Sequence, residues 1–165
     1  MTVKGARPET GHITPHLVVR DAEEAVRFYR RALGAMEVYR AATPESKELR
    51  ILRIANSFVI VGEEDLALRR NNMSYAKIAS PETLRGTTAV FQLNVDDVDE
   101  VYRRALDAGA TPTVPPMDRF WGDRYGLITD PFGHMWALAT VQEELTPEEI
   151  EERMKQQLPK TFSEL

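Results

Sequence analysis

The feature that most constrains the fold of this chain is a pattern of helix signals that occurs twice. A start of the form Asp-x-x-Glu, typical of helix N-termini, leads into apolar residues at helical spacing and then into a glycine that ends the helix. The two copies span residues 21–34 and 97–109, and they share the peptide Tyr-Arg-Arg-Ala-Leu at 29–33 and 102–106. An internal repeat of this kind predicts two copies of one supersecondary unit.

Strand-like runs surround both helices in the same order, with one before the helix and three after it. The expected strands are 12–19, 35–41, 49–54 and 57–61 in the first copy, and 88–95, 111–114, 125–129 and 134–140 in the second. Asp130-Pro131-Phe132-Gly133 suits a type I turn between the last two strands. The sequence therefore predicts an α+β fold of two tandem β-α-β-β-β modules, at residues 11–63 and 87–140, within one domain that spans 11–140.

Three further segments lie outside these modules. Residues 1–10 are expected to form a flexible arm. Residues 64–86 are a polar connector with at most a short helical turn, which is interpreted either as a lid over a cavity or as a plain linker. Residues 141–165 contain a helix start with Thr146 as the N-cap and Pro147 in the first turn, and they predict a C-terminal surface helix and tail.

Composition excludes several classes of function. The chain has 165 residues, of which 42% are hydrophobic and 28% charged, enough for one compact core. A net charge of −5 argues against a nucleic-acid-binding surface. The absence of cysteine excludes thiol chemistry and disulfides. With no apolar run of membrane-spanning length and no secretory signal, a cytoplasmic protein without membrane contact is expected.

The strand faces predict where a cavity would lie. In residues 88–95 one alternating row is wholly apolar and should pack against the helices. The other row is mixed and contains Val90 and Gln92, so it should line a cavity, and the same parity places Thr14 and His16 inside. Scattered polar groups among apolar ones are typical of a small-molecule site. Alternatively, His16 does not contact a ligand but is packed within the fold and hydrogen-bonded to a neighbouring strand.

The segment before the last hairpin carries Trp121, Arg124 and Tyr125. Aromatic faces beside a cation suit a planar or anionic ligand. Alternatively, the tryptophan only closes the mouth of the cavity, and the arginine pairs with Asp123 or Asp118. Trp136 has the opposite strand parity to Ala137 and is expected in the core on the helix side. No nucleophile–base pair and no phosphate-binding loop stands out in the sequence.

The repeat resembles the vicinal oxygen chelate superfamily, which includes glyoxalase I, extradiol dioxygenases and the bleomycin- and fosfomycin-resistance proteins. Three pieces carry the resemblance: TPHLVVRDAEEAVRFYRRALGA, FQLNVDDVDEVYRRALDAGA and FWGDRYGLITDPFGHMWALAT. The last is most similar to the glyoxalase/bleomycin-resistance branch. The resemblance implies modules that roll into a half-open, barrel-like sheet around a cavity, and it implies a homodimer. It does not identify a reaction, because the fold hosts several.

Metal-dependent members of that superfamily place His and Glu ligands on the concave face of the sheet. The corresponding positions here are Thr14, Ile60, Val90 and Ala137, whose side chains cannot replace imidazole or carboxylate ligands. No metal and no other cofactor is therefore expected. His16 lies two residues beyond Thr14 on the same face, so a displaced metal site built around it remains an alternative.

We therefore expect a metal-free protein that binds an apolar or aromatic small molecule, in the manner of the bleomycin-resistance proteins. The competing hypothesis is an enzyme, either a lyase, isomerase or dioxygenase with displaced metal ligands, or a metal-free catalyst with His16 as general base. A regulatory module is a third possibility, suggested by the C-terminal helix alone. The expected ligand-binding residues are Thr14, His16, Phe58, Ile60, Val90, Gln92, Trp121, Arg124, Tyr125 and Ala137.

Overall fold

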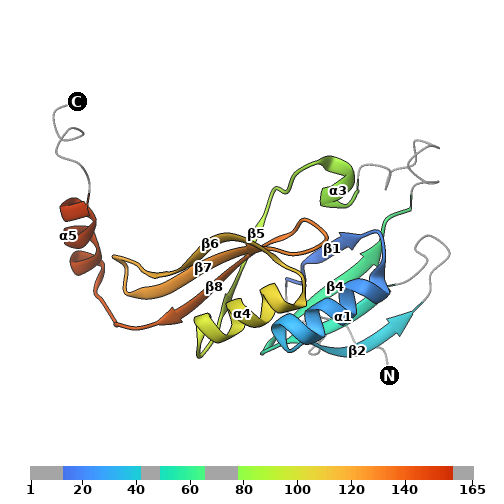
Figure 1. Cartoon of the computed structure of the whole chain (residues 1–165), viewed down its shortest axis with the longest axis horizontal. Helices are drawn as coiled ribbons and strands as arrows, with labels where there is room; N and C mark the ends of the chain where they lie inside the picture. Colours follow the sequence, from blue (N-terminus) through green and yellow to red (C-terminus); the bar gives the residue numbers. More distant parts are fainter. Residues whose placement is uncertain (1–12, 42–48, 66–77, 158–165) are drawn as a thin grey trace, which may run out of the picture.

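The computed structural model describes residues 13–41, 49–65 and 78–157, which form two four-stranded sheets with helices (Figure 1). The first sheet has the order β1-β4-β3-β2 and the second the order β5-β8-β7-β6. The strands are β1 (His16–Val19), β2 (Met36–Ala41), β3 (Leu49–Ile54), β4 (Ser57–Glu63), β5 (Val90–Asn94), β6 (Thr111–Asp118), β7 (Asp123–Thr129) and β8 (Met135–Val141). The helices are α1 (Ala22–Leu33), α3 (Pro81–Leu84), α4 (Val98–Ala108) and α5 (Pro147–Gln157).

The two modules repeat one topology, which confirms the predicted α+β fold of tandem units. In each module the first strand pairs in parallel with the last strand, and the other pairs are antiparallel. The two sheets do not close into a barrel. Helices α1 and α4 pack against each other along the same side of the sheets (Figure 1). The opposite side of each sheet, which these helices do not cover, is called the open face below.

The helix signals in the sequence act as predicted. The Asp21 side chain accepts a hydrogen bond from the Glu24 backbone N–H at 2.8 Å. Asp97 does the same for Glu100 at 3.0 Å. Each bond satisfies a backbone donor that the first turn would leave without a partner. Both helices end at a glycine with positive φ, Gly34 at 67° after α1 and Gly109 at 114° after α4.

The core lies between the helices and the helix side of the sheets. Alternate residues of the strands, such as Leu17, Leu52 and Leu138, are fully buried there. Trp136 is 3% exposed and lies within the cluster, as predicted from its strand parity. The side chain of Asp130, at the β7–β8 turn, joins the two modules because it accepts a hydrogen bond from the Tyr29 hydroxyl of α1 at 2.6 Å.

Strand boundaries differ from prediction in the second module. The expected strand 111–114 continues to Asp118 as β6, past Pro115 and Pro116, with register shifts along its length. β6 is the edge strand of its sheet, and prolines are tolerated there because one row of backbone N–H groups has no partner strand. The β7 strand begins at Asp123, so the expected loop reduces to a short turn at residues 119–122.

The segments outside the modules are described in part. The connector contains one short helix, α3, whose N-cap is Ser80. Residues 1–12 and 66–77 lie outside the described residues, so the arm and the lid remain predictions. The C-terminal helix α5 has no buried residue, and Figure 1 shows it set apart from the body of the fold. None of the helices in the described ranges is long and apolar enough to cross a membrane.

Candidate functional site

The pairing of β1 with β4 places several of the expected ligand-binding residues on the open face of the first sheet. His16 pairs with Ile60, whereas the neighbouring pair Leu17 and Val61 is fully buried on the helix side. Phe58 lies two residues before Ile60 and shares its face. Because strand side chains alternate, His16, Ile60 and Phe58 all point away from α1.

The second sheet presents an equivalent face. Gln92 pairs with Ala137, and Val90 pairs with Met135. The alternate residues Phe91 and Leu93 pack against the core, as predicted for the apolar row. Both also line the pocket between the modules, so the prediction that only the mixed row lines the cavity is confirmed only in part. Val90 is 52% exposed, so this part of the open face is accessible.

The two modules meet at a pocket of about 510 Å³, which we call the seam pocket. Phe58 from the first module lines it together with Val90 and Gln92 from the second, so three of the expected residues converge here. Its volume lies within the range of small-molecule sites, roughly 300–1,000 Å³. The other expected residues do not line this pocket, although Thr14 lies between two residues that do, Ile13 and Pro15.

The lining of the seam pocket is apolar with a few neutral polar groups. Those polar side chains belong to Asn56, Ser57 and Gln92. The Gln92 amide nitrogen donates a hydrogen bond to the Asn94 side-chain oxygen at 3.0 Å, which orients Gln92 at the pocket wall. None of the described residues that line the pocket is titratable. This arrangement can bind and orient an apolar molecule, but its own side chains supply no general acid or base.

The residues present do not fit the metal site of the metal-dependent relatives. Thr14, Ile60, Val90 and Ala137 provide no imidazole or carboxylate, and in the described ranges no three His, Asp or Glu side chains gather as a metal site would require. Nearby carboxylates are already engaged. Glu63 accepts a hydrogen bond from the Ala22 backbone N–H at 3.2 Å, and the Glu64 carboxylate accepts from the hydroxyls of Ser80 and Thr83.

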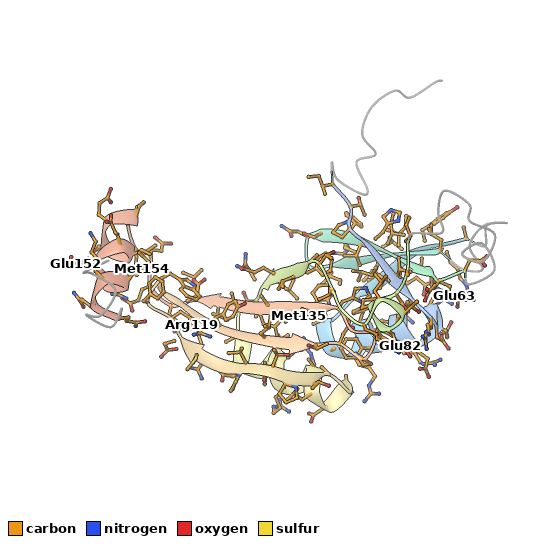
Figure 2. The ribbon with its side chains drawn as sticks, turned by 90° about the horizontal axis from the view of Figure 1, so that it is seen from above. Glu63, Glu82, Arg119, Met135, Glu152 and Met154 are labelled. Carbon is orange, nitrogen blue, oxygen red and sulfur yellow. The ribbon has the colours of Figure 1, made fainter. Side chains whose placement is uncertain are left out.

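The expected aromatic residues lie elsewhere on the second sheet. Tyr125 pairs with Ala139 on the open face, and its ring is 5.8 Å from that of Trp121. The Trp121 indole donates to Asp123 at 3.0 Å. In Figure 2, Arg119 lies toward the end of the second sheet that leads to α5, whereas Met135, the partner of Val90, lies nearer to the first module. The structure therefore separates the aromatic residues from the seam pocket.

The cation beside these rings is Arg119, which the sequence reasoning did not identify. Its guanidinium lies 5.6 Å from the Trp121 ring centre and 5.4 Å from that of Tyr125. The signal that could have revealed it is the parity of the β6–β7 hairpin, since residues 119 and 125 share a face across the turn.

Arg124 has the opposite parity and lies on the helix side. It forms ion pairs with Asp99 of α4 at 2.5 Å and with Asp118 at 2.9 Å, so the alternative pairing with Asp118 is confirmed. Hydrogen bonds to Asp99 and Asp118 raise the pKa of Arg124 above its usual range, and Arg124 in turn lowers the pKa of Asp99. Arg124 is thus held by carboxylates on the helix side, and it does not line the seam pocket.

Comparisons with known proteins agree with this architecture. The family model described as the Glyoxalase/Bleomycin resistance protein/Dioxygenase superfamily matches residues 10–138. An uncharacterized protein of Mycobacterium tuberculosis, Rv0887c, is 39% identical over 145 residues, covering 88% of this chain and 83% of its own. An uncharacterized protein of Mycobacterium bovis, Mb0911c, has the same identity and coverage of this chain, with 93% of its own length matched.

Solved structures are similar in fold. TioX from Micromonospora sp. ML1 is 25% identical, with a TM-score of 0.60, over 79% of this chain and 98% of its own. The fosfomycin resistance protein FosX from Listeria monocytogenes, solved with Mn(II) and a sulfate ion, is 20% identical, with a TM-score of 0.60, over 87% of this chain and 97% of its own. At 20% identity, the similarity to FosX shows a shared fold alone.

Proposed function

The chain belongs to the Glyoxalase/Bleomycin resistance protein/Dioxygenase superfamily, and from that premise we propose that it is a metal-free binding protein for an apolar or aromatic small molecule. The observation that carries this proposal is the seam pocket, whose described lining contains no titratable side chain. A protein that holds such a molecule without chemistry sequesters it, in the manner of the bleomycin-resistance branch. The side chains of Phe58 and Val90 and the amide of Gln92 would contact the ligand.

Substitution of Val90 by arginine tests the location of the site. A charged side chain at this position would place an ion in the apolar pocket and remove the stabilisation that a bound ligand provides, about 2.7 kcal/mol at a ligand concentration of 100 times Kd. The measurement is a thermal-shift screen of planar antibiotics and aromatic metabolites on the wild type and on Val90→Arg. Leu84→Arg in α3 is the matched control, because Leu84 is 52% exposed, as Val90 is, and does not line the seam pocket.

Retention of the full ligand shift in Val90→Arg would contradict the seam pocket as the site. Elemental analysis of protein purified without chelator tests the metal-free part of the proposal, and stoichiometric zinc, nickel, manganese or iron would overturn it.

The alternative is catalysis by His16, which lies exposed on the open face of the first sheet and could act as a general base there. Turnover of a glyoxal-type hemithioacetal that disappears in His16→Gln would favour this enzyme over the binding protein.

We also propose that the protein is a homodimer in which the open faces are covered by a second copy. Large apolar side chains are exposed on them, including Met36 at 53%, Tyr39 at 55% and Met117 at 46%. In its strand, each of these residues lies in the row that faces away from the helices. Sedimentation velocity should show a dimer for the wild type and a shift toward monomer for Tyr39→Glu. A monomeric wild type at all concentrations would contradict the proposal.

A further inference from the structure

A second pocket lies on the helix side of the molecule, away from the open faces. Its volume is about 510 Å³, and it is an open groove lined by α1, the C-terminal end of α4 and the β7–β8 turn. We call it the helix-side groove. It shares no lining residue with the seam pocket, so it is a separate site that the proposed function does not use. Figure 1 shows the two helices that border it running side by side.

The floor of the helix-side groove is aromatic. Phe28 of α1 is 4% exposed, and its ring packs edge-on against that of Phe132 at 6.1 Å. Pro131 and Ala108 extend the apolar surface. Because the floor combines residues of both modules, the groove exists only when α1 is docked against the second module. A ring or alkyl group placed on this floor would bury its apolar surface against Phe132, Pro131 and Ala108, with Phe28 packed beneath them.

The wall formed by α1 is basic. Three arginines and one glutamate line the groove, which gives its lining a net charge of +2 in a chain whose net charge is −5. Arg27 forms ion pairs with Glu23 at 3.8 Å and with Glu24 at 3.4 Å. Among the described residues, no carboxylate pairs with Arg30 or Arg31. These two guanidinium groups are therefore available to an anion from solution.

A simpler role for Arg30 and Arg31 is to compensate for the partial negative charge at the C-terminus of α1, where they occupy the last turn. That role accounts for two basic residues, but it requires neither a pocket nor a paired aromatic floor beside them. The C-terminal end of α4 also carries partial negative charge, so an anion would avoid that wall. Charge and shape therefore place the anionic group at α1 and the apolar body on Phe132 and Pro131.

We propose that the helix-side groove binds an organic anion with an aromatic or similarly flat apolar body, of the class of aromatic carboxylates. Recognition has two parts: the guanidinium groups of Arg30 and Arg31 contact the anion, and the floor contacts the ring system. Arginine suits this role because its planar fork bonds both oxygens of a carboxylate. The interaction lies at the surface, so it should weaken as salt screens it.

The test uses 2-naphthoate and its neutral counterpart 2-naphthamide, titrated calorimetrically into the full chain. The wild type should bind the anion more tightly than the amide, and added salt should remove the difference. The double variant Arg30→Gln/Arg31→Gln should bind 2-naphthoate about ten-fold more weakly and leave 2-naphthamide unchanged. The control is Arg103→Gln/Lys155→Gln, which removes the same charge at two exposed positions outside the groove and should bind as the wild type does.

Backbone amide NMR shifts locate the ligand independently of affinity. Addition of 2-naphthoate should move the signals of Gly109 and Phe132 in the wild type, and these changes should be lost in Arg30→Gln/Arg31→Gln. Three results would overturn the proposal: equal affinity of both double variants, equal affinity for acid and amide, or shifts confined to Gln92 and its neighbours. The last result would instead assign the compound to the seam pocket, and it therefore separates failure of this inference from failure of the proposed function.

Discussion

Asp130→Ala is expected to lower the free energy of unfolding by about 4 kcal/mol, because it leaves several buried donors without a partner. The Asp130 side chain is 0% exposed. Its Oδ2 accepts hydrogen bonds from the Tyr29 hydroxyl at 2.6 Å and from the Trp136 indole at 3.1 Å. Its Oδ1 accepts from the backbone N–H groups of Phe132 and His134, both at 2.9 Å.

The position of this carboxylate explains the size of the effect. The backbone bonds shape the β7–β8 turn within the second module, whereas Tyr29 belongs to α1 of the first. Loss of Asp130 would therefore weaken both the turn and the contact between modules. Burial and the charge of Asp130 raise the pKa of Tyr29 well above its ordinary value, so the hydroxyl remains a donor throughout the neutral range. Stability in a domain of this size is typically about 5–15 kcal/mol, so the variant should be marginal.

Urea unfolding monitored by tryptophan fluorescence measures the effect, with Tyr29→Phe and Asp130→Asn as comparisons. Tyr29→Phe removes one of the four donors and should cost about 1–2 kcal/mol. Asp130→Asn keeps the volume and one acceptor oxygen but turns an NH₂ group toward donors, so it should fall between the other two. A cost for Asp130→Ala no greater than that for Tyr29→Phe would show that the carboxylate does not organise the contact between modules.

The same residue shows how far local sequence signals reach. Asp130 in Asp-Pro-Phe-Gly predicts the turn, because its side chain bonds backbone groups two and four residues away. The helix starts and glycine stops are equally local and were predicted correctly. The bond from Tyr29 joins residues 101 positions apart, and no local pattern indicates it. Local chemistry therefore predicts the elements, whereas the contact between modules depends on their packing.

The candidate site likewise has features that the local sequence predicts and features that depend on how the modules pack. Strand alternation predicted which row of β5 would face the core, because a period of two follows from backbone geometry alone. Alternation does not say where the two sheets meet, so the sequence could not separate Phe58, Val90 and Gln92, which share the seam pocket, from Trp121 and Tyr125. The predicted strand ended before the two consecutive prolines of β6, because proline lacks the backbone N–H that a paired strand donates. An edge strand tolerates proline, since the N–H groups on its outer side have no partner strand.

Arg50→Ala is expected to destabilise the fold by about 3 kcal/mol, because it removes a buried, well-packed arginine side chain together with its ion pairs to two partly exposed carboxylates. Arg50 is 1% exposed and lies on β3, where Leu52 and Ile54 occupy the same helix-side row. Its guanidinium reaches Glu23 of α1 at 2.7 Å and Glu37 of β2 at 3.4 Å. Arg50 thus connects β3, on which it lies, to α1 and to β2.

Arg50→Met separates the contribution of the side-chain volume from that of the charge. Methionine fills most of the space of the arginine stem, and Glu23, whose side chain is 49% exposed, can be rehydrated. Glu37 is 19% exposed and would retain part of the penalty. We expect Arg50→Met to cost about half as much as the alanine variant, since replacement of buried ion pairs by apolar groups of similar size is often tolerated. Equal costs for the two variants would mean that the ion pairs, rather than packing, supply the stability.

The pH dependence of these variants gives a second and independent measurement. The hydrogen bond from Arg50 lowers the pKa of Glu23 below its ordinary value of 4.5. A carboxyl whose folded pKa is depressed contributes stability above its unfolded pKa, and this contribution is lost as the pH falls through the folded pKa. The stability difference between wild type and Arg50→Met should therefore be constant near neutral pH and should shrink below about pH 4.5. Because the Glu23 carboxylate is half exposed, high salt should also reduce the difference, and a difference that persists unchanged in acid would show that Arg50 acts through packing alone.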